Sequence, residues 1–469
     1  MSAPGISESL TIEPPPAVWV RALSRCTPAT ADQRRIREQL GLGTIDPIVM
    51  SGHQAEFWHP GILAKYFAMM AAAELVPDAR AAWVVVDQDT NDPATIRYPK
   101  RAASAGLVRG TWHVPIGSAG GPLPEVPTAH LAPLSPPRDL DLLVRELQPA
   151  TEGVAGGIRR IAFLLHDEAK GTSAAEQVGA AVWAALRDIT APAPAHSPLL
   201  LFATRLNTTD LFAAWVQRMR EDPGTCASAY NGAVAAHPHA RIRPLEVAAG
   251  RCELPLWRVQ AGHARRRIFA EGLADIPREQ LAPRALLMTA LLRAGACDLF
   301  IHGLGGAVYD QVTEHWMAAW QPGVALAPTA VATATRLLRF SGDPAPSPQT
   351  IARAAWLAHS ARHDPAVLGD TTAAEEKRLL VLNIARAREA GHHPRPLYLE
   401  LHHLLESVRR RHSAALRTLD DEAAALRARR AEAGVAFDRA WPFPLYDAAQ
   451  LKQLRDEVIG VFLSGRTGE

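Results

Sequence analysis

The stretch Ile48-Val49-Met50-Ser51-Gly52-His53-Gln54 decides the interpretation of the fold, because a short apolar strand runs directly into a polar turn. An apolar helical segment follows over residues 61–75, and Ala81-Ala82-Trp83-Val84-Val85-Val86 is a second apolar run that ends at Asp87. Uninterrupted apolar strands that alternate with helices are typical of a parallel sheet buried on both faces. The stretch therefore predicts a β–α–β unit with ligand-binding residues at the carboxyl ends of its strands.

A second unit of the same kind lies further along the chain. Asp298-Leu299-Phe300-Ile301-His302 predicts a strand that enters the turn Gly303-Leu304-Gly305-Gly306 and then a helix from residue 307 onward. Two segments, about 115–150 and about 225–275, are predicted to be insertions, the first because it is rich in Pro and Gly. We expect an α/β core over residues 1–371 that carries these inserted connecting segments.

The character of the chain changes at residue 372. Leu and Ala recur at spacings of three and four among charged residues, with a break near Arg411, and a preceding helix ends at Gly391. This pattern is typical of a coiled coil. It predicts a helical coiled-coil hairpin over residues 372–436, followed by a C-terminal segment, 437–469, that packs on the core.

Composition and charge limit the classes of partner. The chain has 469 residues, 48% of them hydrophobic, with 50 Lys and Arg against 48 Asp and Glu. This near-neutral balance favours neither nucleic acid nor a membrane surface as partner. The apolar runs are shorter than the roughly 20 residues of a membrane helix, and the N-terminus does not resemble a signal peptide. We expect a cytoplasmic protein that acts on a small molecule.

The first candidate site is the turn Gly52-His53-Gln54 together with His59. Glycine lets the backbone turn sharply or approach a ligand, and the amino end of the following helix offers free N–H groups to an anion. The two histidines could stabilise charge on a phosphate or a carboxylate. The alternative is structural, with His53 capping the turn and His59 packing at the surface.

The second candidate is the acidic run that follows the second strand, which contains Asp87, Asp89 and Asn91. Carboxylates this close repel one another unless a cation or a donor-rich ligand offsets the repulsion. The alternative is an acidic turn that caps a helix.

The third candidate is Gly303-Leu304-Gly305-Gly306 with Tyr309 and Asp310, where backbone N–H groups would face a ligand. Its alternative is a tight structural turn.

Other chemistry has no clear signal in the sequence. A serine nucleophile elbow, a Walker motif and a His-Glu-x-x-His zinc helix are absent. The four cysteines form no Cys-x-x-Cys pair, so neither a zinc knuckle nor a disulfide framework is indicated. We therefore name no metal ligands.

The first and third candidates carry a resemblance to a known family. Ser51-Gly52-His53-Gln54-Ala55 is similar to the Thr-Gly-Gln-Gln-Ala turn of the bacillithiol biosynthesis cysteine-adding enzyme family. Pro283-Arg284-Ala285 resembles the family's Leu-Arg-Pro segment, which makes Arg284 a binding candidate. Gly303, Gly305 and Tyr309 match its Gly-Pro-Gly-Glu-Ile-Ala-Tyr turn. The chain departs from the family at His53, Leu304 and Gly306, where the family has Gln, Pro and Glu.

The resemblance implies a Rossmann-like, nucleotidyltransferase-type core and a C-terminal coiled coil that can mediate a homodimer. The implied reaction is a ligase reaction that joins cysteine to the amine of a glucosaminyl-malate as an amide. ATP and Mg²⁺ are the candidate cofactors. His53, with the backbone donors at Gly52 and Gly303, would stabilise developing charge. Asp87 or Asp89 would bind the amino group or accept its proton.

Two alternatives remain beside the cysteine-adding enzyme. One is a related ligase or nucleotidyltransferase that acts on another amino sugar or amino acid. The other is a non-catalytic scaffold or binding protein that dimerises through the helical hairpin. The melting temperature separates the non-catalytic protein from the two enzymes. A ligand that binds the folded state must stabilise that state, so the absence of any ligand-induced rise would favour the non-catalytic protein.

Overall fold

The computed structural model of the chain describes residues 8–26, 29–43, 47–102, 106–117, 125–168, 171–190, 197–248, 250–338, 346–436, 438 and 440–464. The chain divides into two compact units. Residues 101–108 and 339–437 belong to a smaller unit, and residues 7–100, 109–338 and 438–469 belong to a larger one. The described residues include no helix that is both long and apolar enough to cross a bilayer.

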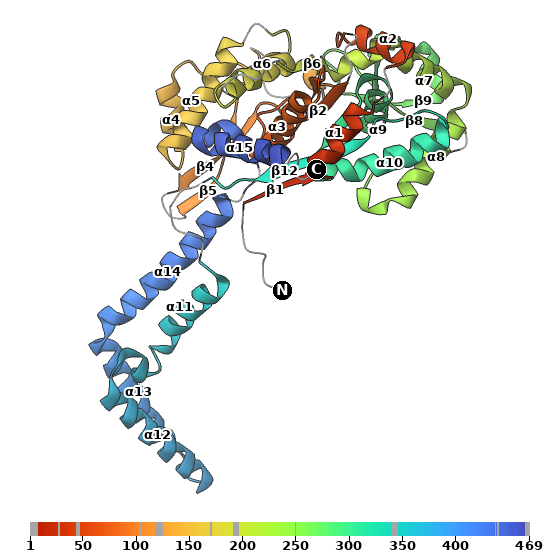
Figure 1. The fold of residues 1–469 in the computed structure, drawn as a ribbon. Coiled ribbons are helices and arrows are strands. Elements are labelled where there is room, and N and C mark those ends of the chain that lie inside the picture. Colours follow the sequence, from red (N-terminus) through yellow and green to blue (C-terminus); the bar gives the residue numbers. More distant parts are fainter. Residues whose placement is uncertain are drawn as a thin grey trace. The chain divides into compact units, whose positions relative to one another are not determined.

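A largely parallel sheet lies at the centre of the larger unit (Figure 1). Its strands stand in the order β1 (Ser9–Glu13), β12 (Thr329–Thr335), β11 (Leu299–His302), β2 (Ile48–Gln54), β3 (Arg80–Val86) and β6 (Leu199–Phe202). All neighbouring pairs are parallel except β1 with β12, which is antiparallel. The expectation of an α/β fold with a parallel-rich sheet is therefore confirmed.

The β–α–β unit predicted from the opening stretch consists of β2, α3 (Pro60–Leu75) and β3. The strands are direct parallel neighbours, with Ser51 opposite Trp83. Helix α3 begins after His59, whose Nδ1 accepts a hydrogen bond of 2.9 Å from the amide of Gly61. It is buried along almost its whole length, because it packs against both β12 and α15 (Ala448–Ser464). Helix α15, near the C-terminus, thus packs on α3.

The other helices and strands of the larger unit surround this sheet. The helices are α1 (Pro16–Ser24), α2 (Ala31–Gln39), α4 (Leu140–Leu147), α5 (Glu152–Asp167), α6 (Ala174–Arg187), α7 (Asp210–Glu221), α8 (Pro223–Ala236), α9 (Ala285–Leu291) and α10 (Leu304–Trp320). An antiparallel sheet contains β10 (Leu281–Pro283), β8 (Arg251–Arg258), β7 (Val247–Ala248) and β9 (Arg266–Phe269). Strands β4 (Thr95–Ala102) and β5 (Gly106–His113) form a separate pair, in which residues 101–102 and 106–108 are assigned to the smaller unit.

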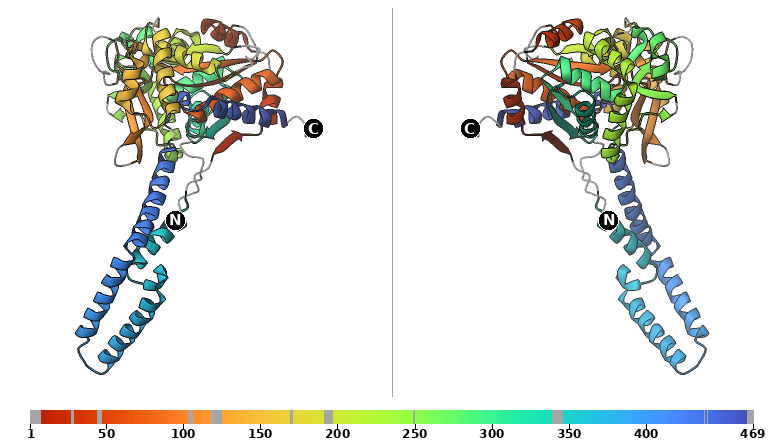
Figure 2. Two further views of the ribbon diagram at one scale, coloured as in Figure 1. Left: turned by 90° about the vertical axis from the view of Figure 1, so that its left-hand side faces the viewer. Right: turned by 90° about the vertical axis from the view of Figure 1, so that its right-hand side faces the viewer.

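The smaller unit is helical. Helix α11 (Pro348–Ser360) packs against α14 (Ser413–Ala436), and α12 (Thr371–Glu389) packs against α13 (Arg395–Arg411), as Figure 2 shows. Gly391 follows α12 with a φ of 70°, a conformation that glycine adopts without strain. The sequence therefore located correctly the end of α12 and the break near Arg411. The helical unit also includes α11, which lies before the predicted boundary at residue 372.

Candidate active site

A cavity of about 900 Å³ lies at the carboxyl ends of the central strands of the main sheet. Its wall is formed by the end of β2, the loop after β3, the turn between β11 and α10, and residues of the antiparallel sheet. Parallel strands place their carboxyl ends at one edge, and ligands of α/β proteins bind there. The position of the cavity follows from the sheet topology.

Most of the residues singled out from the sequence come together in this cavity. Those that line it are Gly52, His53, Gln54, His59, Asp89, Arg284, Gly303, Gly305, Gly306, Tyr309 and Asp310. They come from segments separated by up to about 250 positions in the chain. Asp87 and Asn91 are not among the described lining residues.

Asp87 instead connects β3 to the turn after β6. Its carboxylate accepts hydrogen bonds from the amide of Thr204 at 2.9 Å and from the Thr204 hydroxyl at 2.6 Å. Burial raises the pKa of Asp87 to about 6, although both Thr204 hydrogen bonds work in the opposite direction. Asn91 donates from Nδ2 to the Ala55 carbonyl at 3.1 Å. In this structure both side chains hold loops at the rim.

Asp89 lies at the centre of a polar cluster in the cavity wall. Its Oδ1 is 2.9 Å from Nη1 of Arg265, and its Oδ2 accepts a hydrogen bond of 3.1 Å from Nε2 of Gln54. The guanidinium of Arg265 lies over the Trp257 ring, 4.5 Å from the centroid. The cluster therefore joins the end of β2, the loop after β3 and the β8–β9 hairpin.

Arg284 lies over the same Trp257 ring, at 4.1 Å, and its Nη2 is 2.6 Å from Oε1 of Glu253. Arg243 and Arg267 also lie within ion-pair distance of Glu253, so three guanidinium groups share one fully buried carboxylate. Burial lowers the pKa of Arg284, although Glu253 works against this. Glu246 also pairs with Arg267, but the single charge of Glu253 cannot neutralise both Arg243 and Arg284, which leaves positive potential at this wall.

The β11–α10 turn supplies the opposite wall. Helix α10 has Gly303 at its N-cap, and the Ala307 amide donates a hydrogen bond of 3.2 Å to the Gly303 carbonyl at the start of the helix. The amides of residues 304–306 therefore lie before the helical ladder, where a helix attracts anions. A Cβ added to Gly306 would stand 2.6 Å from Nδ1 of His302, so only glycine fits beside that ring.

His302 belongs to a buried polar chain that the sequence did not indicate. Its Nε2 is 3.4 Å from Oδ2 of Asp310, and the same oxygen is 2.7 Å from Nη1 of Arg293. Burial raises the pKa of Asp310, but His302 and Arg293 outweigh this effect and leave the pKa below its ordinary value. Asp310 is therefore an ionised partner of two groups and adds no free negative charge to the cavity.

Lys65 is the buried cation of the site. Its Nζ donates a hydrogen bond of 2.7 Å to the Gly52 carbonyl, and the side chain is 6% exposed. Burial lowers the pKa of Lys65 from 10.5 to about 7. A lysine held at this pKa gains a full charge when an anion binds beside it. Its position between Ala64 and Tyr66, in the apolar stretch of residues 60–73, was the signal that the sequence analysis missed.

Gln88 adds a neutral polar group to the wall. Its Nε2 donates to the Pro283 carbonyl at 2.6 Å, which fixes the amide, and its side chain is almost fully buried. Its Oε1 has no hydrogen-bond partner among the described residues. A buried acceptor without a partner costs free energy, so Oε1 suits a ligand N–H or O–H group.

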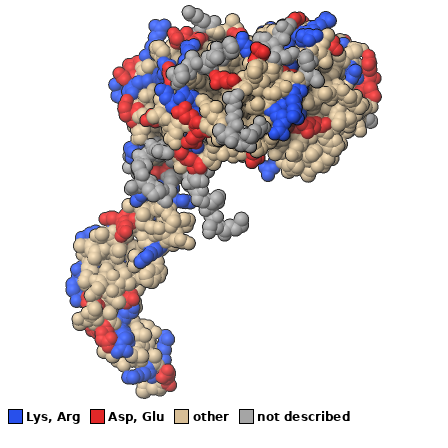
Figure 3. Space-filling view, in the orientation of Figure 1, with Lys and Arg blue, Asp and Glu red and all other residues tan. Residues whose placement is uncertain are grey.

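The lining as a whole carries a surplus of positive charge. Among the described lining residues, Lys65, Arg241, Arg243, Arg265 and Arg284 are basic, whereas Asp89 and Asp310 are acidic. Each aspartate has its own arginine partner. Figure 3 shows basic and acidic side chains interspersed over the face in view, so the surplus is a property of the cavity rather than of the whole chain.

The described residues contain no group of three or more His, Cys, Asp or Glu side chains that could hold a metal ion. No protein-family model matches the chain, and no curated protein matches it. The chemistry of the site is therefore the basis for a functional assignment.

Proposed function

We propose that the protein is an enzyme that acts on a small anionic molecule, with a carboxylate or phosphate bound at the N-terminus of α10. The observation that carries this proposal is the excess of basic over acidic lining residues around amides 304–306. Backbone N–H groups at a helix N-terminus and nearby guanidinium groups both favour negative charge. Lys65 has a pKa of about 7, so a bound anion would favour its protonated, positively charged form.

Within this class we propose a carbon–nitrogen ligase that resembles the cysteine-adding enzyme of bacillithiol biosynthesis. The three segments that carry the resemblance contribute Gly52, Arg284 and Tyr309 to one cavity, which supports a common site. The two carboxylates of a glucosaminyl-malate suit the basic lining. Its amine suits Oε1 of Gln88, which has no partner among the described residues.

Amide formation from a carboxylate needs an activated carboxyl group, for which ATP with Mg²⁺ is the implied cofactor. The basic lining suits a polyphosphate as well as a carboxylate. In this proposal His53 accepts the proton of the attacking amine, and Lys65 and the α10 amides stabilise the anionic groups. Asp89 positions Gln54 and Arg265 through its two contacts.

Gly306, where the resembling family has a glutamate, lies beside the His302 ring. The family has a glutamate there, but in this chain any side chain at 306 would collide with the His302 ring. We propose that His302, held by Asp310, supplies the polar group of this wall. An imidazole in place of a carboxylate makes the wall less negative, which favours a more anionic substrate.

Two structural features belong to the same proposal. The parallel strands β11, β2, β3 and β6, with the cavity at their carboxyl ends, support a Rossmann-like core of the nucleotidyltransferase type. The α12–α13 pair supports a coiled-coil hairpin that forms a homodimer. Its exposed apolar side chains are Leu379, Val381, Leu382 and Leu399.

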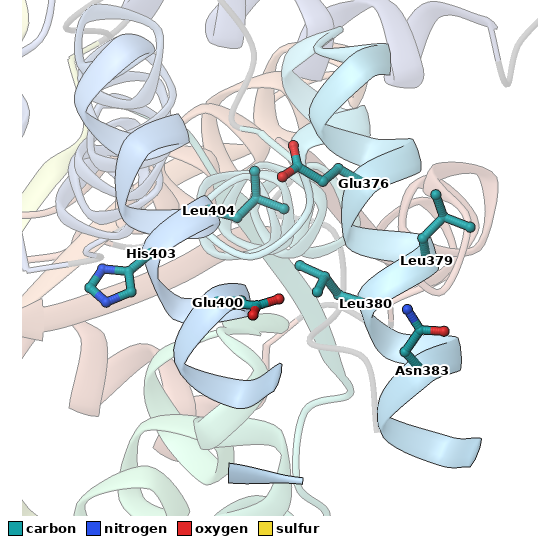
Figure 4. A pocket seen from close by; sticks show the side chains of 7 residues that line it. All are labelled: Glu376, Leu379, Leu380, Asn383, Glu400, His403 and Leu404. Carbon is teal, nitrogen blue, oxygen red and sulfur yellow. The ribbon is translucent and has the colours of Figure 1, made fainter. Parts of the chain in front are cut away.

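A cavity of about 480 Å³ lies between α12 and α13 (Figure 4). In that view Glu400 and Leu404 of α13 point toward α12, whereas His403 points away from it. Apolar residues that are exposed beside an incompletely filled helix pair favour a further helix as partner.

The reaction is tested by incubating the purified chain with cysteine, glucosaminyl-malate, ATP and Mg²⁺, and analysing the products by mass spectrometry. The expected product is the cysteinyl amide, formed about 10²–10⁴-fold more slowly by His53→Ala. The matched control is His166→Ala, which removes an exposed imidazole from α5. Absence of the amide with the wild-type chain would exclude the cysteine-adding reaction.

A further inference from the structure

A second, smaller cavity lies beside the candidate active site. It has a volume of about 360 Å³ and is lined by Glu56, Phe57, His59, Pro93, Thr95, Ile96, Arg97, Ala440 and Pro442. His59 lines both cavities, whereas His53 lines the larger one and Glu56 the smaller one. The loop between β2 and α3 thus forms part of the wall that separates them.

His53 and Glu56 meet within this wall. Nδ1 of His53 is 3.4 Å from Oε1 of Glu56, and the two side chains are 20% and 41% exposed. Nδ1 is buried and has no hydrogen bond of good geometry among the described residues. An unsatisfied buried nitrogen costs free energy, and contacts of catalytic pairs are often long before substrate binds. A shortening of a few tenths of an ångström would complete the bond.

We propose that Glu56 is a positioning residue that holds His53 as a general base. The Glu56 carboxylate accepts the Nδ1–H of His53, and this leaves the lone pair on Nε2 for a substrate in the larger cavity. The inference rests on the proposed function for the identity of the reaction, but the tautomer that it assigns to His53 does not depend on that function.

The proton transfers balance as follows in an amide-forming reaction. The amine nitrogen attacks the activated carboxyl carbon, and a C–N bond forms. The C–O bond between that carbon and the activating phosphate group breaks, and its electron pair leaves with the phosphate. The amine proton moves to Nε2 of His53. Glu56 stabilises the resulting imidazolium while Nδ1 keeps its proton, as a carboxylate does in a catalytic triad. The Nε2 proton then passes to water when the product leaves.

The surroundings give the pair a defined pH dependence. Burial, with Lys65 and His59, holds the pKa of His53 well below its usual value, and only the Gln54 backbone opposes this. Burial raises the pKa of Glu56 to about 7, with Arg97 opposing and Asp89 adding to the effect. His53 is therefore neutral at neutral pH, and the carboxylate that positions it forms as the pH rises through about 7.

The test is ¹⁵N nuclear magnetic resonance of the full chain labelled at histidine, at pH 8, with His53→Gln used to assign the His53 signals. We expect the wild type to show His53 protonated at Nδ1, and Glu56→Leu to shift the tautomer toward Nε2–H. Glu74→Leu removes an exposed carboxylate at the other end of α3 and should change nothing. Glu56→Asp keeps a carboxylate at this position and should retain part of the wild-type tautomer. This conservative variant tests the role of the carboxylate even where the leucine variant folds poorly.

The same His53 tautomer in the wild type and in folded Glu56→Leu would overturn the proposal. Where the amide-forming assay succeeds, Glu56→Leu should lower kcat by about 10²–10⁴-fold, leave KM for the anionic substrate unchanged and remove the rise in rate near pH 7. An unchanged pH profile would also overturn it. Failure of the wild-type assay alone contradicts the ligase, whereas the tautomer measurement judges Glu56 separately.

Discussion

At the scale of single residues, the charge of Lys65 depends strongly on its surroundings. Among the described residues, a charged lysine inside α3 is offset by one hydrogen bond, to the Gly52 carbonyl, and by the Trp83 ring at 5.7 Å. Burial therefore moves its pKa to about 7. A buried lysine of this kind lowers the stability of the ligand-free protein, and it gains a charge partner when an anion binds. Binding sites often lose stability in this way for the sake of function.

Replacing Lys65 by methionine should stabilise the protein at neutral pH. The folded pKa of about 7 lies below the unfolded value of 10.5, so the folded chain binds fewer protons between these values and its stability rises with pH there. The burial penalty is thus largest below pH 7. We expect Lys65→Met to raise the free energy of unfolding by a few kcal/mol at pH 6.5 and by much less at pH 10.

Urea denaturation at these two pH values measures the difference. A gain that is equal at both would show that Lys65 does not change its charge in this range.

Anion affinity should also depend on pH through Lys65. If the ammonium form binds the ligand, the Kd rises by up to about tenfold per pH unit above pH 7, because the proton must be taken up with the ligand. Titration calorimetry with glucosaminyl-malate at pH 6.5 and 8.5 gives the two constants. In Lys65→Met the dependence should be flat, and a steep dependence in that variant would assign it to another group.

The residue scale also shows where sequence reasoning reached its limit. Asp87 follows β3 directly, and the sequence could not tell which way its carboxylate faces. The structure directs it to Thr204, while Asp89, two positions later, lines the cavity. The catalytic role proposed for Asp87 remains a prediction to be tested, but the Thr204 contacts give it a structural role already.

At the scale of secondary-structure elements, the turn between β11 and α10 contributes both to packing, through Gly306, and to the proposed anion site. Gly306→Ala should force the His302 ring aside, because the new Cβ would stand 2.6 Å from Nδ1. We expect a loss of about 1–3 kcal/mol of stability and weaker anion binding, since His302 and the helix N-terminus share the site. Gly305→Ala is the matched control, because no atom lies within 4 Å of its added Cβ.

Thermal unfolding and calorimetry on the two variants measure both effects. Equal behaviour of the Gly306 and Gly305 variants would contradict the contact with His302.

The elements that the sequence predicted are those with continuous apolar character. The runs that became β2, β3 and β11 carry large apolar side chains, so their burial could be read directly from composition. Strand β12 escaped notice because Thr329–Thr335 contains only Thr, Ala and Val. Its place beside β11 comes from tertiary pairing, which overrides the weak local signal.

At the scale of the whole molecule, the cavity was only partly predictable. Parallel topology brings strand ends together, so Gly52, Asp89 and Gly303 could be expected near one another. Arg265, Trp257 and Glu253 come from strand β8 and the β8–β9 connection of the antiparallel sheet, and local patterns do not reveal which residues of that sheet reach a distant site. The basic character of the cavity depends on these long-range contacts.

The proposed dimer is also a prediction for the whole chain. Leu379 and Leu399 are about half exposed, on α12 and α13. Replacing both with glutamate would place like charges in a contact between two copies, and we expect this to convert a dimer into a monomer. Light scattering coupled to size-exclusion chromatography measures the mass, and a monomeric wild type would contradict the dimer.

The central claim is that the cavity at the carboxyl ends of β2, β3 and β11 binds a small anion. The most direct measurement is titration calorimetry at pH 6.5 with glucosaminyl-malate and with a glucosamine glycoside that carries the same amine but lacks the malate carboxylates. We expect the malate compound to bind at least tenfold more tightly, and to lose this advantage in Arg284→Met. Equal affinity for the two compounds, or binding of neither, would contradict the anion-binding site.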